Sequence, residues 1–248
     1  MKTTVIVPVY NRPDALRLAI RSLLERAGQV DLDILIVDDG STDQTTSVTA
    51  DLVQSITNVR VVPRENGGVA AARNTGLLNL LPETQIVTFL DSDDIIAANR
   101  FGPDLAVLRD NPDIEITYGD MVGTDQINPE TLCPAENAIA RRMTSIHLSC
   151  ALMRRSLVDR IGLFDTDLKQ AEDTDYLLRI FESGTKFAQT DTICHYYLRH
   201  PGNMTKKLDE AKKSFALALM KSIQRRKSDP SRQLNKPSFN IDFPAELL

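Results

Sequence analysis

Apolar runs alternate with helix-length amphipathic segments over the first 120 residues of the chain. Short runs rich in β-branched residues predict strands buried on both faces, at residues 3–9, 32–37, 59–62, 86–90 and 114–118. A helix is expected from Pro13, because Leu16, Ile20 and Leu23 fall on one stripe. Ser41 can cap a second helix, and a third covers residues 69–81. Strands separated by helix-length segments predict right-handed crossovers and a mostly parallel sheet.

The pattern is less regular after residue 120. Polar and proline-containing segments over residues 120–149 predict loops, and helices are expected at residues 154–160, 171–183 and 207–226. Gly162 and Gly184 supply the stops of the first two helices. Residues 227–248 contain prolines and no clear period, which is typical of a tail. We therefore expect one domain over residues 1–226, followed by a C-terminal tail over residues 227–248.

The composition is that of an ordinary globular protein. The 248 residues are 42% hydrophobic and 25% charged, which suits one large α/β domain or two small ones. The net charge of -5 argues against general nucleic-acid binding. Cys133, Cys150 and Cys194 are far apart and odd in number, which predicts a reducing, cytoplasmic location rather than a zinc site or a disulfide framework.

The hydropathy pattern predicts no transmembrane segment. No apolar run approaches the ~18 residues that a membrane-spanning helix needs. The first apolar run ends at Pro8 and is soon followed by Asn11 and Arg12, so it is too short for a signal peptide. Peripheral association with a membrane surface stays open.

Polar clusters follow three of the predicted strands, at residues 9–11, 38–41 and 91–94. Ligands of open α/β sheets collect at the carboxyl ends of the strands, where these clusters should meet. Each cluster alone could be turn chemistry, because Asp, Asn, Gly and Ser favour strand-to-helix connections. Three clusters at one edge of one sheet predict a pocket.

The sequence Asp91-Ser92-Asp93 is the sharpest of the three clusters. Closely packed carboxylates repel one another unless a cation or a proton neutralises them. Mg²⁺ and Mn²⁺ prefer oxygen ligands and keep positions open for phosphate. The two carboxylates would therefore hold a divalent ion that bridges to a diphosphate and offsets the charge on a departing phosphate. The alternative is a solvated acidic turn.

The motifs, taken in order along the chain, resemble glycosyltransferase family 2. They lie at residues 7–11, 37–43, 66–76, 89–94, 162–165, 172–176 and 197–200. The resemblance implies an α/β fold of the GT-A (nucleotide-diphospho-sugar transferase) type, with a mostly parallel central sheet flanked by helices. It divides the domain into a nucleotide-binding half, residues 1–120, and an acceptor and catalytic half, residues 121–226.

The resemblance also implies the reaction. A sugar would pass with inversion from a nucleotide-diphosphate sugar to a hydroxyl of a glycan, lipid-linked or other acceptor, in polysaccharide or glycoconjugate synthesis. A UDP-sugar is favoured because Asp39 matches the residue that contacts uracil, although guanine or thymine would also offer an N–H. The cofactor would be a divalent cation, Mn²⁺ or Mg²⁺. Its ligands would come from Asp91, Asp93 and His200.

The residues that match the donor site of the family form a larger set. They are Pro8, Val9, Tyr10, Asn11, Asp39, Gly68, Arg73, Asp91, Ser92 and Asp93. Arg73 is expected to contact a phosphate or Asp91 through its planar fork of donors; the alternative is a surface helix arginine. His200 could instead be a structural loop histidine. His147 and His195 match no motif and are expected to be packing or surface residues.

Asp173 matches the catalytic base of the family. Independently, it falls on the same helical stripe as Leu177 and Ile180, so it is expected to face inward at the start of its helix. Partial desolvation there could raise its pKa towards a useful value. Two alternatives stay open. Asp173 could merely complement the helix N-terminus, or Glu172 could be the base.

Two other classes of function are weighed against this reading. A nucleotidyltransferase would carry a glycine-rich phosphate loop after the first strand, which residues 9–13 do not resemble. A non-catalytic nucleotide-sugar-binding domain would show a degraded base or metal motif, whereas both motifs are intact here.

Overall fold

The first four long strands form a parallel sheet with β1 (Thr3–Val9) at its centre. A computed structural model describes residues 1–200 and 208–240. In it β1 pairs in parallel with β2 (Leu32–Asp38) and β4 (Ile86–Phe89), and β3 (Val59–Pro63) pairs in parallel with β2. Every residue of β1 and β2 is buried. The β-branched runs therefore form strands covered on both faces, as the sequence predicts.

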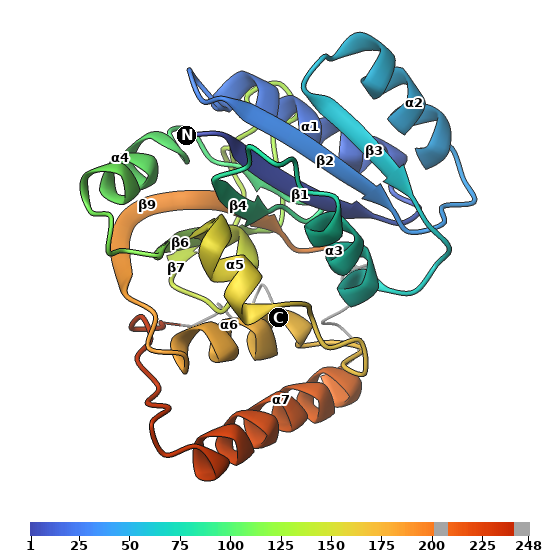
Figure 1. Cartoon of the computed structure of the whole chain (residues 1–248). Coiled ribbons are helices and arrows are strands. Elements are labelled where there is room, and N and C mark those ends of the chain that lie inside the picture. Colours follow the sequence, from blue (N-terminus) through green and yellow to red (C-terminus); the bar gives the residue numbers. More distant parts are fainter. Residues whose placement is uncertain (201–207, 241–248) are drawn as a thin grey trace.

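Helices cover both faces of this parallel sheet (Figure 1). Val5 and Val7 of β1 share a core with α1 (Pro13–Arg26) and α2 (Thr45–Ser55), and Ile6 shares the other core with α3 (Val69–Leu78). This division follows from the alternation of side chains along a strand. The expected cap at Ser41 is wrong: α2 begins at Thr45, and the Ser41 hydroxyl accepts a backbone N–H from Asn11 at 3.0 Å instead.

The second half of the sheet mixes directions. The strand order is β3-β2-β1-β4-β8-β6-β9-β5, and β7 pairs with β6 off this path. β6 (Ile116–Thr124) is parallel to β9 (Phe187–Leu198) but antiparallel to β7 (Ala140–Met143) and β8 (Ala151–Arg154), and β5 (Ile95–Ile96) is antiparallel to β9.

The elements of this second half differ more from those that the sequence predicts. β6 continues to Thr124, beyond the expected end at Tyr118, and β7 lies in a region expected to be loops. Neither α4 (Gly102–Asp110) nor β9 was expected. Residues of β9 alternate irregularly between buried and partly exposed positions. Such a half-buried, bent strand lacks the continuous apolar run that identified β1.

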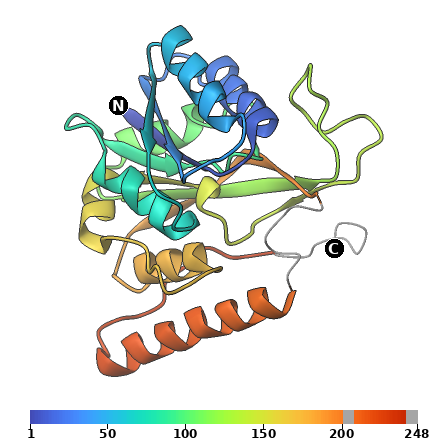
Figure 2. The ribbon, with the colours of Figure 1, turned by 90° about the vertical axis from the view of Figure 1, so that its right-hand side faces the viewer.

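Three helices lie on the side of the sheet opposite α1 and α2. α5 (Arg155–Ile161) follows β8 and ends at Gly162, whose φ of 79° supports the predicted stop. α6 (Glu172–Phe181) packs against the core, and α7 (Leu208–Ser228) lies along the outer side of α6 (Figures 1 and 2). A short 3-10 turn, η1 (Leu148–Cys150), precedes β8.

The chain after α7 returns towards the sheet. The Asn235 backbone N–H donates to the Phe181 carbonyl at 3.0 Å, and the Phe239 ring lies 5.8 Å from the Tyr118 ring. The division of the chain at residue 226 stays a prediction. Across the two described ranges, no helix combines the length and apolar character that a membrane crossing requires.

Candidate functional site

Loops at the carboxyl ends of β1, β2 and β4 contact one another. The Asn11 backbone N–H, after β1, donates to the Ser41 hydroxyl, after β2, at 3.0 Å. The side-chain oxygen of Asn11 accepts the N–H of Thr42 at 2.8 Å. Arg12 lies 3.7 Å from Asp93, which follows β4. The three polar clusters that the sequence placed at one edge of the sheet therefore meet there.

Asp39 lies beneath the glycine-rich turn that precedes α3. Its buried carboxylate accepts backbone N–H groups from Gly67 at 3.1 Å and from Gly68 at 2.8 Å, and it pairs with the Arg64 guanidinium. Gly68 has a φ of 86°, a conformation that favours glycine. Asp39 thus fixes the shape of the turn. Arg64 contacts the carboxylate that, by the family resemblance, would accept an N–H of the nucleobase.

The other donor-site candidates from the first strand differ in exposure. Val9 packs into the core with Leu16, so only its backbone can face the loop. Tyr10 is 47% exposed beside Asn11 and presents an aromatic ring at this edge. Asp38 accepts the Ser41 N–H at 2.9 Å, which makes it a loop-forming residue.

Arg73 joins three elements through its guanidinium. It is buried on α3, and it donates to Asp91, after β4, at 2.7 Å and to Glu172, at the start of α6. Contact with Asp91 is one of the two roles expected from the sequence; the contact with Glu172 was not foreseen. Burial disfavours the Asp91 carboxylate, but the charges of Arg73 and His147 outweigh it and lower the Asp91 pKa.

Glu172 responds differently to the same arginine. Burial is the largest influence on it, and together with the charge of Asp173 it outweighs Arg73, so the Glu172 pKa rises to about 7. Arg73 is therefore held mainly by an ionised Asp91, while Glu172 can gain or lose a proton near neutral pH. The charge of this cluster depends on pH.

Asp93, which follows β4, and His200, which follows β9, converge from distant parts of the chain. His200 follows β9, and its Nε2 lies 2.9 Å from the Oδ2 of Asp93. Ligands that share one divalent cation with bonds of about 2.1 Å lie roughly 3 Å apart. A carboxylate oxygen and an imidazole nitrogen at this spacing form a hydrogen bond and also fit a divalent cation, and Arg12 lies 3.7 Å from the same Oδ2.

Asp173 occupies the first turn of α6. It is half-buried, and its carboxylate accepts the N–H of Thr174 at 2.6 Å. Its charge acts on both Arg73 and Glu172, which places it beside their cluster. A carboxylate that is near a buried ionic cluster and still reached by solvent can exchange protons with a bound molecule.

Two histidines that the sequence assigned to packing or to the surface lie beside the acidic motif. His195 of β9 is fully buried, and its Nε2 lies 3.6 Å from Asp94. His147 lies 3.6 Å from Asp91 and 3.9 Å from Asp94. Together Asp94, His147 and His195 form a group able to hold a metal ion. The sequence could not place His195 here because β9 was not predicted, and His147 lies in a segment expected to be a loop.

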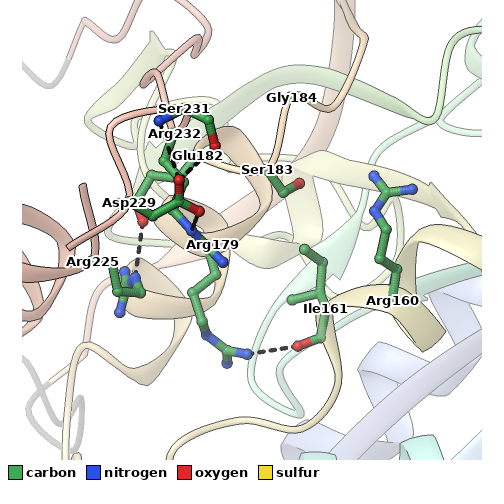
Figure 3. Close-up of a pocket in the computed structure, with 10 residues that line it drawn as sticks. All are labelled: Arg160, Ile161, Arg179, Glu182, Ser183, Gly184, Arg225, Asp229, Ser231 and Arg232. Carbon is green, nitrogen blue, oxygen red and sulfur yellow. Dashed lines mark hydrogen bonds and ion pairs between the residues drawn. The ribbon is translucent and has the colours of Figure 1, made fainter. Parts of the chain in front are cut away.

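A separate cavity lies at the opposite end of α6 (Figure 3). It has a volume of about 460 Å³, and its lining includes Arg179, Glu182, Arg225 and Asp229. α6 spans roughly 14 Å from its first turn to its last, so this cavity is remote from Asp173. Its charged side chains pair mostly with one another. We therefore place the functional site at the sheet edge.

Comparison with protein families gives a match over most of the chain. The model described as Glycosyl transferase family 2 matches residues 4–162. The uncharacterized glycosyltransferase EpsJ of Bacillus subtilis is 26% identical over 223 residues, which cover 82% of this chain and 62% of EpsJ. The chain thus spans less than two-thirds of this relative.

Solved structures share the fold. TarS of S. aureus (residues 1–349), in complex with UDP-GlcNAc, superposes with a TM-score of 0.69 at 21% identity, covering 89% of this chain and 66% of TarS. Mannosyltransferase PcManGT of Pyrobaculum calidifontis, in complex with GDP-Man and Mn²⁺, gives a TM-score of 0.67 at 19% identity, with 90% and 64% covered. These likenesses confirm the predicted α/β GT-A fold.

Proposed function

The chain belongs to glycosyl transferase family 2, and from this premise we propose that it moves a sugar with inversion from a UDP-sugar to an acceptor hydroxyl. The observation that carries the proposal is the meeting of two sets of groups at one sheet edge: the Asp93–His200 pair and the Arg73–Asp91–Glu172 cluster beside Asp173. The Asp93–His200 pair suits a cation and a diphosphate. The cluster beside Asp173 suits proton transfer. Membership of the family supports an acceptor in polysaccharide or glycoconjugate synthesis.

The nucleotide would lie over the loops after β1 and β2. Tyr10 offers an exposed ring for stacking on the base. Asp39 could accept a base N–H if Arg64 moves away from it, and Gly68 would leave room for the diphosphate at the start of α3. The TarS complex contains UDP-GlcNAc and the PcManGT complex contains GDP-Man. Which nucleotide this chain binds must therefore be tested directly.

Asp93 and His200 are the residues that would hold a divalent cation, Mn²⁺ or Mg²⁺. Such a cation, when bound, offsets the negative charge on the departing nucleoside diphosphate. Asp91 would stay directed at Arg73, with which it already pairs at 2.7 Å. Arg12, 3.7 Å from Asp93, is placed to approach a phosphate oxygen.

Asp173 would act as the general base. As the acceptor oxygen bonds to the anomeric carbon, its proton passes to the Asp173 carboxylate and the bond from that carbon to the phosphate oxygen breaks. One displacement of this kind inverts the anomeric configuration. Arg73 and Glu172 would hold the first turn of α6 against the donor site, because Arg73 links that turn to Asp91.

A thermal-shift screen tests the donor half of the proposal. UDP, GDP, dTDP and CMP are each added with Mn²⁺, with Mg²⁺ or with a chelator. We expect UDP to raise the melting temperature only when a cation is present, and Asp93→Asn to remove this rise. The matched control is Asp51→Asn, an exposed carboxylate on α2. Stabilisation by another nucleotide would reassign the donor, and no stabilisation by any nucleotide would refute the donor site.

A further inference from the structure

Three side chains from distant parts of the chain, two of them buried and one partly buried, converge near Asp93. Asp94 lies between β4 and β5, His147 precedes η1, and His195 is in β9. One ligand atom from each lies within 4.8 Å of the others. The Oδ2 of Asp94 is 3.6 Å from the Nε2 of His195 and 3.9 Å from the Nε2 of His147. We call these three residues the Asp–His–His cluster.

The cluster contains polar atoms without hydrogen-bond partners. Within the described part of the chain, neither ring nitrogen of His195 has a partner, although the residue is 0% exposed. The Oδ2 of Asp94 also lacks one, while its Oδ1 accepts the Leu198 N–H at 3.2 Å. A separation of 3.6 Å is too long for a direct hydrogen bond between Asp94 and His195. Buried polar groups are rarely left unsatisfied, so these atoms indicate a bound species.

The charges around the cluster favour a cation. The Oδ2 of Asp91 lies 3.6 Å from the Nε2 of His147, so a second carboxylate stands beside the cluster. Neutral imidazole is the form that binds metals. A positive ion at this point would offset the negative charges of the neighbouring carboxylates.

We propose that Asp94, His147 and His195 bind a divalent transition-metal ion, with Zn²⁺ the best fit, at a structural site separate from Asp93 and His200. Imidazole nitrogens suit Zn²⁺, whereas Mg²⁺ and Mn²⁺ favour carboxylate oxygens. Tetrahedral ligands with bonds of about 2.0–2.1 Å lie roughly 3.3–3.4 Å apart. The observed 3.6 and 3.9 Å exceed this separation by about 0.2–0.6 Å, and all three ligand atoms lie within 4.8 Å of one another, so side-chain adjustment would bring them onto one ion.

The ion would join three segments, two of which are already linked by the hydrogen bond from the Leu198 N–H to Asp94. It would tie the loop carrying Asp93 and Asp94 to β9, which leads directly to His200. The fourth coordination position would be open to a water on the side of Asp91, whose Oδ2 is 3.6 Å from the Nε2 of His147. Because the ion would bind the folded chain and not the unfolded chain, it would stabilise the folded state by mass action. This role requires no nucleotide.

Metal content and melting temperature test the site. The full chain, purified without a histidine tag, is stripped with a chelator, incubated with Zn²⁺, desalted and measured by mass spectrometry for metals. We expect about one Zn²⁺ per chain. At roughly a hundredfold excess over Kd, Zn²⁺ should raise the melting temperature by about 5–10 °C. Co²⁺ in its place should give the visible absorption of a tetrahedral site.

Variants separate this site from the donor site. His195→Gln and Asp94→Asn should each lose the bound Zn²⁺ and the Zn²⁺-dependent shift, whereas His200→Gln and Asp93→Asn should keep both. Absence of tightly bound metal from the wild type would overturn the proposal, and that measurement does not depend on any variant folding. Loss of the metal in His200→Gln with retention in His195→Gln would overturn it as well, by moving the ion to the donor site. A failed nucleotide screen would leave these results unaffected.

Discussion

At the scale of single residues, the site depends on Arg73, which pairs with two acids whose pKa values shift in opposite directions. Arg73 contacts both Asp91 and Glu172 from a buried position, yet the pKa of Asp91 is lowered and that of Glu172 is raised to about 7. Asp91 is thus the ionised partner at every physiological pH. Glu172 is the group whose protonation changes in that range.

Replacing Glu172 should change how stability depends on pH. Its folded pKa of about 7 lies above its ordinary value of 4.5, so its protonated form stabilises the fold below pH 4.5, and this contribution is lost as pH rises through about 7. Glu172→Gln cannot ionise and should gain about 1–3 kcal/mol on the wild type between pH 5 and pH 8. Urea unfolding at both values measures this gain. If the difference in unfolding free energy between Glu172→Gln and the wild type stays constant, or falls, as pH rises, the pKa assigned to Glu172 is wrong. Glu25→Gln, which replaces an exposed glutamate, is the control.

Single motifs showed which residues gather at the site but not which contacts they make. Asp91 and Asp93 could be selected from the sequence because closely packed carboxylates after an apolar strand favour a cation, and Arg73 because it matches a motif of the family. The sequence could not predict that Asp39 pairs with Arg64 or that His195 is buried. Both depend on tertiary packing that no local pattern records.

At the scale of elements, the joint between β6 and β9 sets the geometry of the second half. Their register shifts between Tyr118 and Met121, where β9 carries extra residues between Gln189 and His195, so the bulge lies on β9. β1 could be predicted because a strand buried on both faces needs an unbroken apolar run. β9 could not, because one of its faces is partly exposed and its bend interrupts the alternation.

Adding a methyl group at Gly119 should weaken this joint. A Cβ there would lie 2.5 Å from the Thr192 carbonyl oxygen and 2.7 Å from the Cys194 sulfur. Because backbone must shift to make room, Gly119→Ala should cost about 1–3 kcal/mol of unfolding free energy. Gly102→Ala, at the start of α4, meets open space and should change stability by less than about 0.5 kcal/mol. Equal effects in the two variants would show that β6 and β9 tolerate a wider separation.

At the scale of the whole molecule, α7 is attached to α6 through buried carboxylates. Arg225 of α7 donates to Glu182 at 2.9 Å and to Asp175 at 2.8 Å, and both carboxylates are buried near α6. Arg225 and Glu182 also line the cavity at this end of α6 (Figure 3). The amphipathic period of α7 predicted a helix, but periodicity could not identify the acids that it covers.

Removing Arg225 should therefore cost more than removing a surface charge. Arg225→Ala removes the 2.9 Å partner of the buried Glu182, which keeps the Ser222 hydroxyl and Arg226, at 3.9 Å, as neighbours. We expect a loss of about 2–4 kcal/mol in urea unfolding, below the full value for an enclosed pair because Arg225 is partly exposed. Lys227→Ala, on the exposed side of α7, should be close to neutral. A loss below about 1 kcal/mol for Arg225→Ala would mean that α7 is held by its apolar contacts.

The central claim is that the acids meeting at this sheet edge cleave a sugar nucleotide, with Asp173 removing a proton from the attacking hydroxyl. The most direct measurement is release of nucleoside diphosphate from a panel of UDP-sugars, with Mn²⁺ and a library of carbohydrate acceptors. The wild type should release UDP from at least one donor. Asp173→Asn should release it at least about a hundredfold more slowly while UDP still raises its melting temperature. Release by Asp173→Asn at the wild-type rate, or no release from any donor, would contradict the account.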